Sequence, residues 1–300
     1  MQEEQQLSAG TSIIADGTTL GVAGTGVMGR TLIRGLLASG VIGPARLWAG
    51  DKNASACEAA SQELGIPVEA DYQHRVPTAD LILMCVKPAD AAAVLCALRD
   101  AGLRRDTLLI SILAGVSTER IESLLGRENP VVRAMPNTPC VVGEGMTVIC
   151  RGRNAAKSHL ERAARIFEAV GRCIPADEVH FNAITALSGS GPGYQFLIIE
   201  ALADAGVRVG LPRQLALTLA AQTTLGAARM VLETGRHPAS LRDDVTTPAG
   251  CTIAGLLMLE DGRVRSVLAR AVEEATRIAA QLGGAPAKNA EPVAGLRTGH

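Results

Sequence analysis

The chain has 300 residues, of which 47% are hydrophobic and only 2% aromatic, and its formal net charge is -1. This length suits two domains, whose cores must consist mainly of Ala, Leu, Val and Ile. A nearly neutral chain cannot present a strongly basic face without an equally acidic one, so nucleic acid is excluded as a partner.

The cysteines and histidines indicate neither disulfides nor a metal site. Seven cysteines occur without a C-x-x-C pair, and five histidines are scattered along the chain. This pattern is typical of reduced thiols in a cytoplasmic protein, and we expect no bound metal. Residues 1–12 are acidic and polar, so no secretory signal is expected. The uncharged stretch 181–199 is broken by glycine and proline, so no membrane span is expected either.

The first half of the sequence alternates short apolar runs with helical patterns. The run DLILMCV at 80–86 is almost entirely apolar, as in a strand buried on both faces. Strands are expected at 19–22, 46–49, 80–86, 107–112, 131–134 and 146–149, and helices at 28–38, 54–64, 89–99 and 158–170. This alternation predicts an α/β fold with a Rossmann-type, doubly wound parallel sheet.

The second half contains only helical patterns. Helices are expected at 181–184, 192–206, 212–234, 252–261 and 263–282. The stretch 212–234 is apolar around most of its circumference, and a small helical domain has little room to bury it, so we expect an obligate homo-oligomer. The expected organisation is a flexible tail at 1–18, a Rossmann dinucleotide-binding domain at 19–176, a helical dimerisation and substrate domain at 177–283, and a flexible tail at 284–300.

A glycine-rich turn follows the first predicted strand. It reads Gly-Thr-Gly-Val-Met-Gly from Gly24 to Gly29, which is the G-x-G-x-x-G pattern. Gly24 permits the turn, Gly26 allows the backbone to approach a pyrophosphate, and Gly29 allows close packing of helix and strand. Other glycine-rich turns share the pattern, but its place between strand and helix predicts a dinucleotide site. The candidate ligands in this turn are Gly24, Gly26, Val27 and Met28.

Asp51 stands at the end of the second predicted strand, where an acid can accept hydrogen bonds from the 2′-hydroxyl of the adenosine ribose. An acid there repels a 2′-phosphate and favours NADH. The next residues, Lys52 and Asn53, could reverse that preference, so NADPH and NADH both stay open.

Two further loops follow buried strands at the sheet edge where ligands bind. One contains Val86, Lys87 and Pro88, and the other contains Leu113 and Ala114. Lys87 is either a solvated surface lysine or a charge beside the ribose and phosphates. Small residues after the second of these strands would let the flat nicotinamide ring lie close to the chain.

A loop near the C-terminus, Asp243–Gly255, predicts an anion site. Pro248 ends the preceding segment, and Thr252 is placed to cap the next helix. Free N–H groups and the positive end of the dipole favour an anion at such a helix start. The loop contains no lysine or histidine, so backbone and hydroxyl groups would hold the anion. The alternative is an ordinary capped loop between two helices.

Taken together, these motifs resemble the pyrroline-5-carboxylate reductase family from about residue 19 to 282. The matching segments are Gly24–Gly29, Val86–Pro88, Ala134–Pro139 (AMPNTP), Leu187–Tyr194 (LSGSGPGY), Gly206–Pro212 (GVRVGLP) and Thr246–Thr252.

The resemblance implies a Rossmann domain joined to a helical dimerisation domain, in homodimers that assemble further, for example into a decamer. It implies hydride transfer from NAD(P)H to the C=N carbon of L-1-pyrroline-5-carboxylate, which gives L-proline in the last step of proline biosynthesis. The matching loop would bind the substrate carboxylate through Thr247, Gly250, Cys251 and Thr252. It also implies that Thr252 lies near the ring nitrogen as the catalytic residue and that Glu178 lies near the substrate.

Departures from the family pattern leave alternatives open. Ala249 replaces a usual glycine, which is tolerable only if its φ is negative. Asp51 replaces a small hydroxyl residue that relatives commonly place at the 2′-phosphate. One alternative is a reductase of a different cyclic imine or imino acid. A β-hydroxyacid dehydrogenase is disfavoured because it needs a lysine in the helical domain, and none lies between Lys157 and Lys288. A non-catalytic NAD(P)-binding regulator is disfavoured because the implied substrate residues are present.

Overall fold

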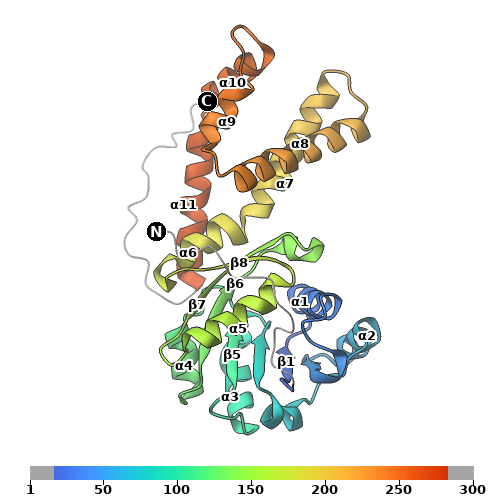
Figure 1. Cartoon of the computed structure of the whole chain (residues 1–300), viewed down its shortest axis with the longest axis vertical. Coiled ribbons are helices and arrows are strands. Elements are labelled where there is room, and N and C mark those ends of the chain that lie inside the picture. Colours follow the sequence, from blue (N-terminus) through green and yellow to red (C-terminus); the bar gives the residue numbers. More distant parts are fainter. Residues whose placement is uncertain (1–16, 283–300) are drawn as a thin grey trace, which may run out of the picture. The chain divides into compact units, whose positions relative to one another are not determined.

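A computed structural model describes residues 17–282 (Figure 1). Contacts divide them into two units, each taken here by itself: residues 17–189 with 276–282, and residues 190–275. The tails expected at 1–18 and 284–300 lie outside the described residues, apart from Gly17 and Thr18, and Thr18 is buried.

The first unit is built on one eight-stranded sheet in the order β3-β2-β1-β4-β5-β6-β7-β8. The strands are β1 (Leu20–Ala23), β2 (Leu47–Gly50), β3 (Val68–Glu69), β4 (Leu81–Met84), β5 (Leu108–Ser111), β6 (Val131–Met135), β7 (Gly145–Arg151) and β8 (Gly171–Pro175). All neighbours pair in parallel except β6 and β7, which are antiparallel. The doubly wound, mainly parallel sheet is thus confirmed, with the last two strands, β7 and β8, reversed.

Helices cover both faces of this sheet (Figure 1). They are α1 (Val27–Ala38), α2 (Ala54–Leu64), α3 (Ala91–Asp100), α4 (Thr118–Leu125), α5 (Lys157–Glu168) and α6 (Phe181–Ile184). One core cluster packs α1 and α5 on the side of Leu81 and Leu83, and the other packs α3 and α4 on the side of Ile82 and Met84. Because β4 is buried on both faces, its sequence is a continuous apolar run.

Three short elements in this unit were not predicted. β3 has only two residues, and β8 contains both glycine and proline, which hide a strand pattern. Helix α4 has usable cap signals, because Ser117 accepts a hydrogen bond from the Arg120 N–H and Gly126 ends the helix with φ 64°. A search for caps would have found α4.

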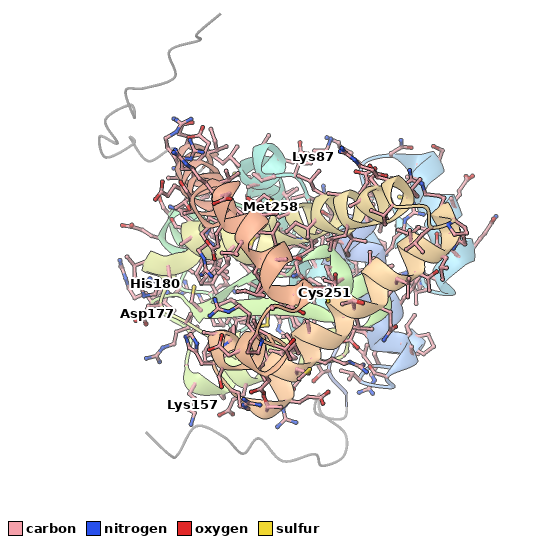
Figure 2. All side chains as sticks on the ribbon, turned by 90° about the horizontal axis from the view of Figure 1, so that it is seen from above. Lys87, Lys157, Asp177, His180, Cys251 and Met258 are labelled. Atoms are coloured by element: carbon pink, nitrogen blue, oxygen red, sulfur yellow. The ribbon has the colours of Figure 1, made fainter. Side chains whose placement is uncertain are left out.

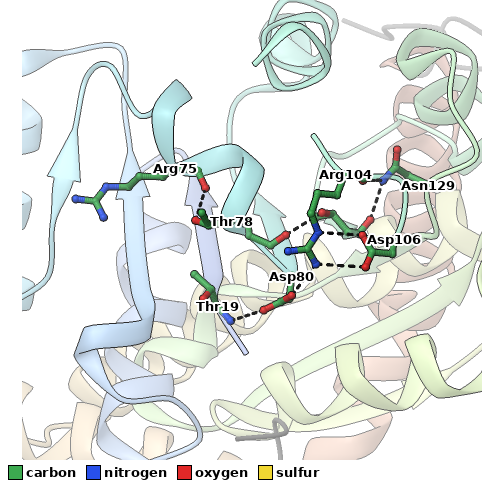
Figure 3. A network of polar contacts seen from close by, with 9 residues as sticks. Thr19, Arg75, Thr78, Asp80, Arg104, Asp106 and Asn129 are labelled. Atoms are coloured by element: carbon green, nitrogen blue, oxygen red, sulfur yellow. Dashed lines mark hydrogen bonds and ion pairs between the residues drawn. The ribbon is translucent and has the colours of Figure 1, made fainter. Parts of the chain in front are cut away.

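A polar cluster ties together the amino ends of the strands (Figure 3). Asp80 accepts hydrogen bonds from the Thr19 N–H and from Arg104 Nη2, both at 2.8 Å. Arg104 also donates to Asp106 at 3.0 Å, and Asn129 donates to the carbonyl oxygen of Arg104. Burial raises the pKa of Asp80, but these hydrogen bonds and the charge of Arg104 outweigh it, so the pKa is lowered overall.

The second unit is entirely helical. It contains α7 (Gly191–Arg208), α8 (Arg213–Thr234), α9 (Pro238–Asp244), α10 (Cys251–Asp261) and most of α11 (Val264–Leu282). The four long helices follow the expected pattern, whereas the short helix α9 was not predicted. Gly235 ends α8 in the left-handed conformation, as its sequence position predicts.

The core cluster of the second unit consists of three alanines, Ala203, Ala216 and Ala220, with Ile199 and Val207 packed against them, and Leu241 is also buried. Larger apolar side chains of this unit are exposed, among them Phe196, Leu197, Leu219, Leu232, Leu257 and Met258. By length and composition alone, α8 is apolar enough to cross a membrane, and only 11% of its most apolar window is buried. A unit with so small a core needs further apolar surface to pack against.

Candidate functional site

The glycine turn between β1 and α1 has one open side. Gly24 has φ 104°, and a Cβ there would lie 2.7 Å from the Cys85 backbone. A Cβ on Gly29 would lie 2.1 Å from the Gly24 carbonyl oxygen. A Cβ on Gly26 would meet no atom within 4 Å. Gly24 and Gly29 are therefore required by packing, whereas the space over Gly26 fits a pyrophosphate group.

The start of α1 also fits an anion. Its N-cap is Gly26, which offers no side-chain cap, and the first turn contains no acidic residue. Val27 is 75% exposed, and Met28 is half-buried against the core. The first N–H groups of α1 therefore have no side-chain acceptor at the N-cap and can bind phosphate oxygens.

A cavity of about 430 Å³ adjoins this turn at the carboxyl ends of β1, β2 and β4. The strand order reverses here, which is where dinucleotides bind in doubly wound sheets, and the volume suits part of such a ligand. Polar and charged residues that line it are Asp51, Lys52, Tyr72, Gln73, Lys87 and Asp90. Tyr72 packs against Trp48 with ring centroids 5.4 Å apart, and burial, assisted by the charge of Asp51, raises its pKa.

Asp51, Lys52 and Asp90, which line this cavity, all have polar partners within the protein. Asp51 accepts hydrogen bonds from the Thr25 N–H at 2.9 Å and the Thr25 hydroxyl at 3.2 Å. The Lys52 ammonium lies 3.2 Å and 3.1 Å from the two carboxylate oxygens of Asp90. The sequence identified Asp51 and Lys52 as candidates but missed Asp90, because its partner lies on another strand–helix connection.

The loops after β4 and β5 differ in what they can offer a ligand. Lys87 is exposed (Figure 2) and lines the cavity together with Val86, and Pro88 is exposed beside them. Ala114 is half-buried, whereas Leu113 is only 2% exposed and belongs to the core. Leu113 can therefore face a cofactor only through its backbone.

The loop between α9 and α10 in the second unit forms a tight turn. The Gly250 N–H donates to the Thr247 carbonyl oxygen at 3.0 Å, and Ala249 has φ 55°. Pro248 at the second position and a positive φ at the third are typical of a type II turn. The condition of a negative φ at Ala249 is therefore not met, since this turn requires the left-handed conformation there.

Gly250, and not Thr252, is the N-cap of α10. The expected cap is thus wrong: the turn ends one residue before Cys251, which places Thr252 inside the first helical turn. Gly250 makes no side-chain cap, and a Cβ there would lie 2.3 Å from Thr247 Oγ1. The glycine therefore allows the Thr247 hydroxyl to lie against the helix start.

The start of α10 has the features of an anion site. Its first turn contains no acidic residue. Cys251 is exposed (Figure 2), and Thr252 is half-buried. No hydrogen bond from the Thr252 hydroxyl is found within residues 17–282. The N–H groups, together with the hydroxyls of Thr247 and Thr252, could bind a carboxylate and a neighbouring ring nitrogen.

Glu178, in the first unit, is engaged by protein groups. It accepts hydrogen bonds from the Thr118 N–H at 2.8 Å, the Thr118 hydroxyl at 2.6 Å and Arg133 Nη1 at 3.0 Å. Arg133 is buried and lies 4.6 Å from the centre of the Phe181 ring. Glu178 thereby links the start of α4 to β6, while direct contact with substrate stays a prediction. A charged residue inside the apolar strand VVRAM was the signal for this cluster.

No group of His, Cys, Asp and Glu suited to a metal is found among the described residues. All seven cysteines are free, and burial raises the pKa of Cys150 and Cys173 to about 12. His180 is exposed.

Comparisons with known proteins cover both halves of the chain. Residues 178–282 match the family model for pyrroline-5-carboxylate reductase dimerisation, and residues 19–115 match a model described as NADP oxidoreductase, coenzyme F420-dependent. The pyrroline-5-carboxylate reductase of Arabidopsis thaliana is 40% identical over 270 residues, which cover 90% of this chain and 97% of the relative. That of Escherichia coli is 36% identical over 253 residues, which cover 84% and 94%.

Solved structures of the same family superpose on this chain. A pyrroline-5-carboxylate reductase from Coxiella burnetii superposes with a TM-score of 0.83 and 35% identity, covering 89% of this chain and 99% of that one. The Plasmodium falciparum pyrroline carboxylate reductase, solved with NADP bound, gives a TM-score of 0.79 and 32% identity, covering 89% and 98%.

Proposed function

The chain belongs to the pyrroline-5-carboxylate reductase family, and we infer that it reduces the C=N bond of L-1-pyrroline-5-carboxylate to L-proline, the last step of proline biosynthesis. The hydride comes from a reduced nicotinamide coenzyme. The observation that carries this conclusion is the identity with named reductases over nearly the whole chain. The open side of the glycine turn at Gly26 supports it.

The protein's part in this reaction is mainly positioning. A protonated cyclic imine is already electrophilic, so the chain has to hold its C=N carbon against the nicotinamide. Positioning of this kind can supply roughly 7–11 kcal/mol in favourable cases. We propose that the substrate carboxylate binds at the start of α10, on Thr247, Gly250 and Cys251. The Thr252 hydroxyl forms a hydrogen bond with the ring nitrogen.

The proposed coenzyme ligands follow the edge of the sheet. They are Gly24, Gly26, Val27, Met28, Asp51, Lys52, Val86, Lys87, Pro88, Leu113 through its backbone, and Ala114. We propose a slight preference for NADH over NADPH, because an acid at the end of the second strand, here Asp51, repels a 2′-phosphate, although Lys52 and Asn53 could reverse it. The Glu178 carboxylate accepts hydrogen bonds from Thr118 and Arg133, so it would affect the substrate through these two residues.

We further propose a boundary near residue 177 between a dinucleotide-binding domain and a dimerisation and substrate domain. The match of the dimerisation model from residue 178 supports it. A homodimer that assembles into a larger particle, such as a decamer, would cover the exposed apolar side chains of the second unit. Seven free cysteines support a cytoplasmic location.

The role of Thr252 can be tested with purified protein, pyrroline-5-carboxylate and each reduced nicotinamide. Thr252→Ala should lower kcat by about 10- to 100-fold, because a hydrogen bond to a charged group contributes about 1.5–3 kcal/mol. Coenzyme affinity, measured by fluorescence titration, should change little. Thr252→Ser keeps the hydroxyl and should retain most of the activity.

Unchanged kinetics in Thr252→Ala would remove this residue from the mechanism. A wild-type protein that ignores pyrroline-5-carboxylate but reduces a six-membered cyclic imine carboxylate would establish the alternative substrate.

A further inference from the structure

The ion pair between Lys52 and Asp90 lies at the edge of the proposed coenzyme cavity. The lining of this cavity includes two carboxylates, Asp51 and Asp90, and two ammonium groups, Lys52 and Lys87. Lys52 lies within 3.2 Å of both Asp90 oxygens. The cation next to Asp51 in the sequence is therefore already paired with an anion.

Asp90 ends the 3-10 turn Pro88–Asp90 that leads directly into α3, and its own backbone is helical, with φ -88° and ψ -5°. Its side chain makes no cap hydrogen bond to α3. Both carboxylate oxygens instead reach across to Lys52, from the connection after β4 to the connection after β2.

The pairing bears on the choice between the two coenzymes, which differ by the 2′-phosphate of NADPH. That phosphate lies near the residues that follow the second strand, here Asp51 and Lys52. It needs an unpaired cation and is repelled by nearby carboxylates. Lys52 is the adjacent cation, but Asp90 holds its ammonium group and neutralises its charge.

We propose that Asp90 is a selectivity residue that acts through Lys52: by holding the Lys52 ammonium, it disfavours NADPH relative to NADH. This inference rests on the proposed dinucleotide site. Asp90 is a positioning residue in this account, since it acts on the coenzyme through another side chain. The pair is exposed to solvent on the lysine side, with 80% of that side chain accessible, so it contributes little to stability. Its effect should therefore be visible in selectivity and not in folding.

The test uses the whole protein and two probes, adenosine 2′,5′-bisphosphate and adenosine 5′-diphosphate, whose dissociation constants are measured by calorimetry. Asp90→Asn keeps the shape of the side chain and removes its charge. It should improve binding of the 2′-phosphate probe relative to the other by about tenfold, which corresponds to about 1.4 kcal/mol. The ratio of kcat/KM for NADPH and NADH should rise in parallel.

Three further variants test whether the effect of Asp90 requires Lys52 and whether it depends on the position of the charge. In a Lys52→Met background, Asp90→Asn should leave the ratio unchanged, because the cation that it releases is gone. Asp100→Asn is the matched control: it removes one negative charge at the other end of α3, where Asp100 pairs with Arg99 outside the cavity lining. That variant should bind both probes as the wild type does.

The outcomes separate this inference from the proposed function. If the wild type binds both probes and Asp90→Asn leaves their ratio unchanged, the role of Asp90 is refuted while the dinucleotide site stands. An equal gain with and without Lys52 also refutes it, because the charge would then act directly on the phosphate. A wild type that binds neither probe would overturn the proposed site and this inference together.

Discussion

Ala249 is in a backbone conformation that suits glycine better. Its φ of 55° lies in the left-handed region, which costs a residue with a Cβ roughly 1–2 kcal/mol. Pro248 and the hydrogen bond from Gly250 to Thr247 hold it there. Because this turn leads into α10, the strain is located in the proposed substrate loop.

Ala249→Gly should therefore raise the free energy of unfolding. The gain should be about 0.5–1 kcal/mol, since the added freedom of glycine in the unfolded chain offsets part of the relieved strain. Denaturant titration at fixed protein concentration measures it. The control is Ala59→Gly, at an exposed position inside α2, which should lower stability by about 1 kcal/mol. A loss in both variants would show that Ala249 is not strained.

Two glycines in the coenzyme turn show how one residue type serves two purposes. Gly24 is required by its positive φ and its contact with the Cys85 backbone, whereas Gly26 faces open space. The G-x-G-x-x-G pattern predicts both. The pattern could not predict that the Asp51 carboxylate accepts a hydrogen bond from Thr25 of this turn. That contact depends on the pairing of β1 with β2.

At the scale of elements, the carboxyl ends and the amino ends of the strands have different roles. The carboxyl ends of β1, β2 and β4 surround the proposed coenzyme cavity. The amino ends are fastened by the cluster around Asp80 and Arg104 (Figure 3). Asp80 connects the residue before β1 with the connection that leads to β5, so it holds three neighbouring strands in register.

Asp80→Asn should lower stability in a pH-dependent manner. The folded-state pKa of Asp80 is lowered relative to the unfolded chain, so the carboxylate stabilises the fold above about pH 4, and this stabilisation is lost as pH falls through the lower folded value. At pH 7 the variant should lose about 1 kcal/mol, a modest value because the Arg104 pair is partly exposed. Near pH 3 the difference from wild type should shrink.

Denaturant titrations at both pH values measure this difference. Asp71→Asn, on the exposed connection after β3, serves as control and should stay within about 0.5 kcal/mol of wild type at pH 7. A loss at Asp80 that is equally large at low pH would show that the charge of the carboxylate is not what stabilises the strands.

At the scale of the whole molecule, the second unit buries few apolar side chains of its own. Its core cluster consists of three alanines with Ile199 and Val207 packed against them, whereas leucines and methionines of α8 and α10 are exposed. Residues 178–282 match a dimerisation model, and we expect a second copy of the chain to cover this surface. The same explanation covers the apolar composition of α8, which by itself would also suit a membrane-spanning helix.

Met258→Glu should weaken the oligomer. Met258 is 67% exposed on α10 (Figure 2), and a carboxylate buried there against a partner would lose its hydration. The particle mass measured by light scattering should fall, and the unfolding midpoint should fall most at low protein concentration. Lys157→Glu changes an exposed residue at the start of α5 and should leave the mass unchanged. A wild-type mass in Met258→Glu would place this side chain outside the interface.

By itself the sequence determined the parallel strands, the coenzyme turn and the helical second half, because periodicity and glycine spacing act over a few neighbouring residues. The Gly250 cap, the left-handed Ala249, the reversal of β7 and β8 and the contacts of Glu178 and Asp90 were decided only by the tertiary structure. Each of these depends on a turn geometry or on a partner brought close by folding, such as Arg133 for Glu178 and Lys52 for Asp90. A pattern of neighbouring residues in the sequence cannot predict such distant contacts, since they form only when strands far apart in the chain become neighbours in the sheet.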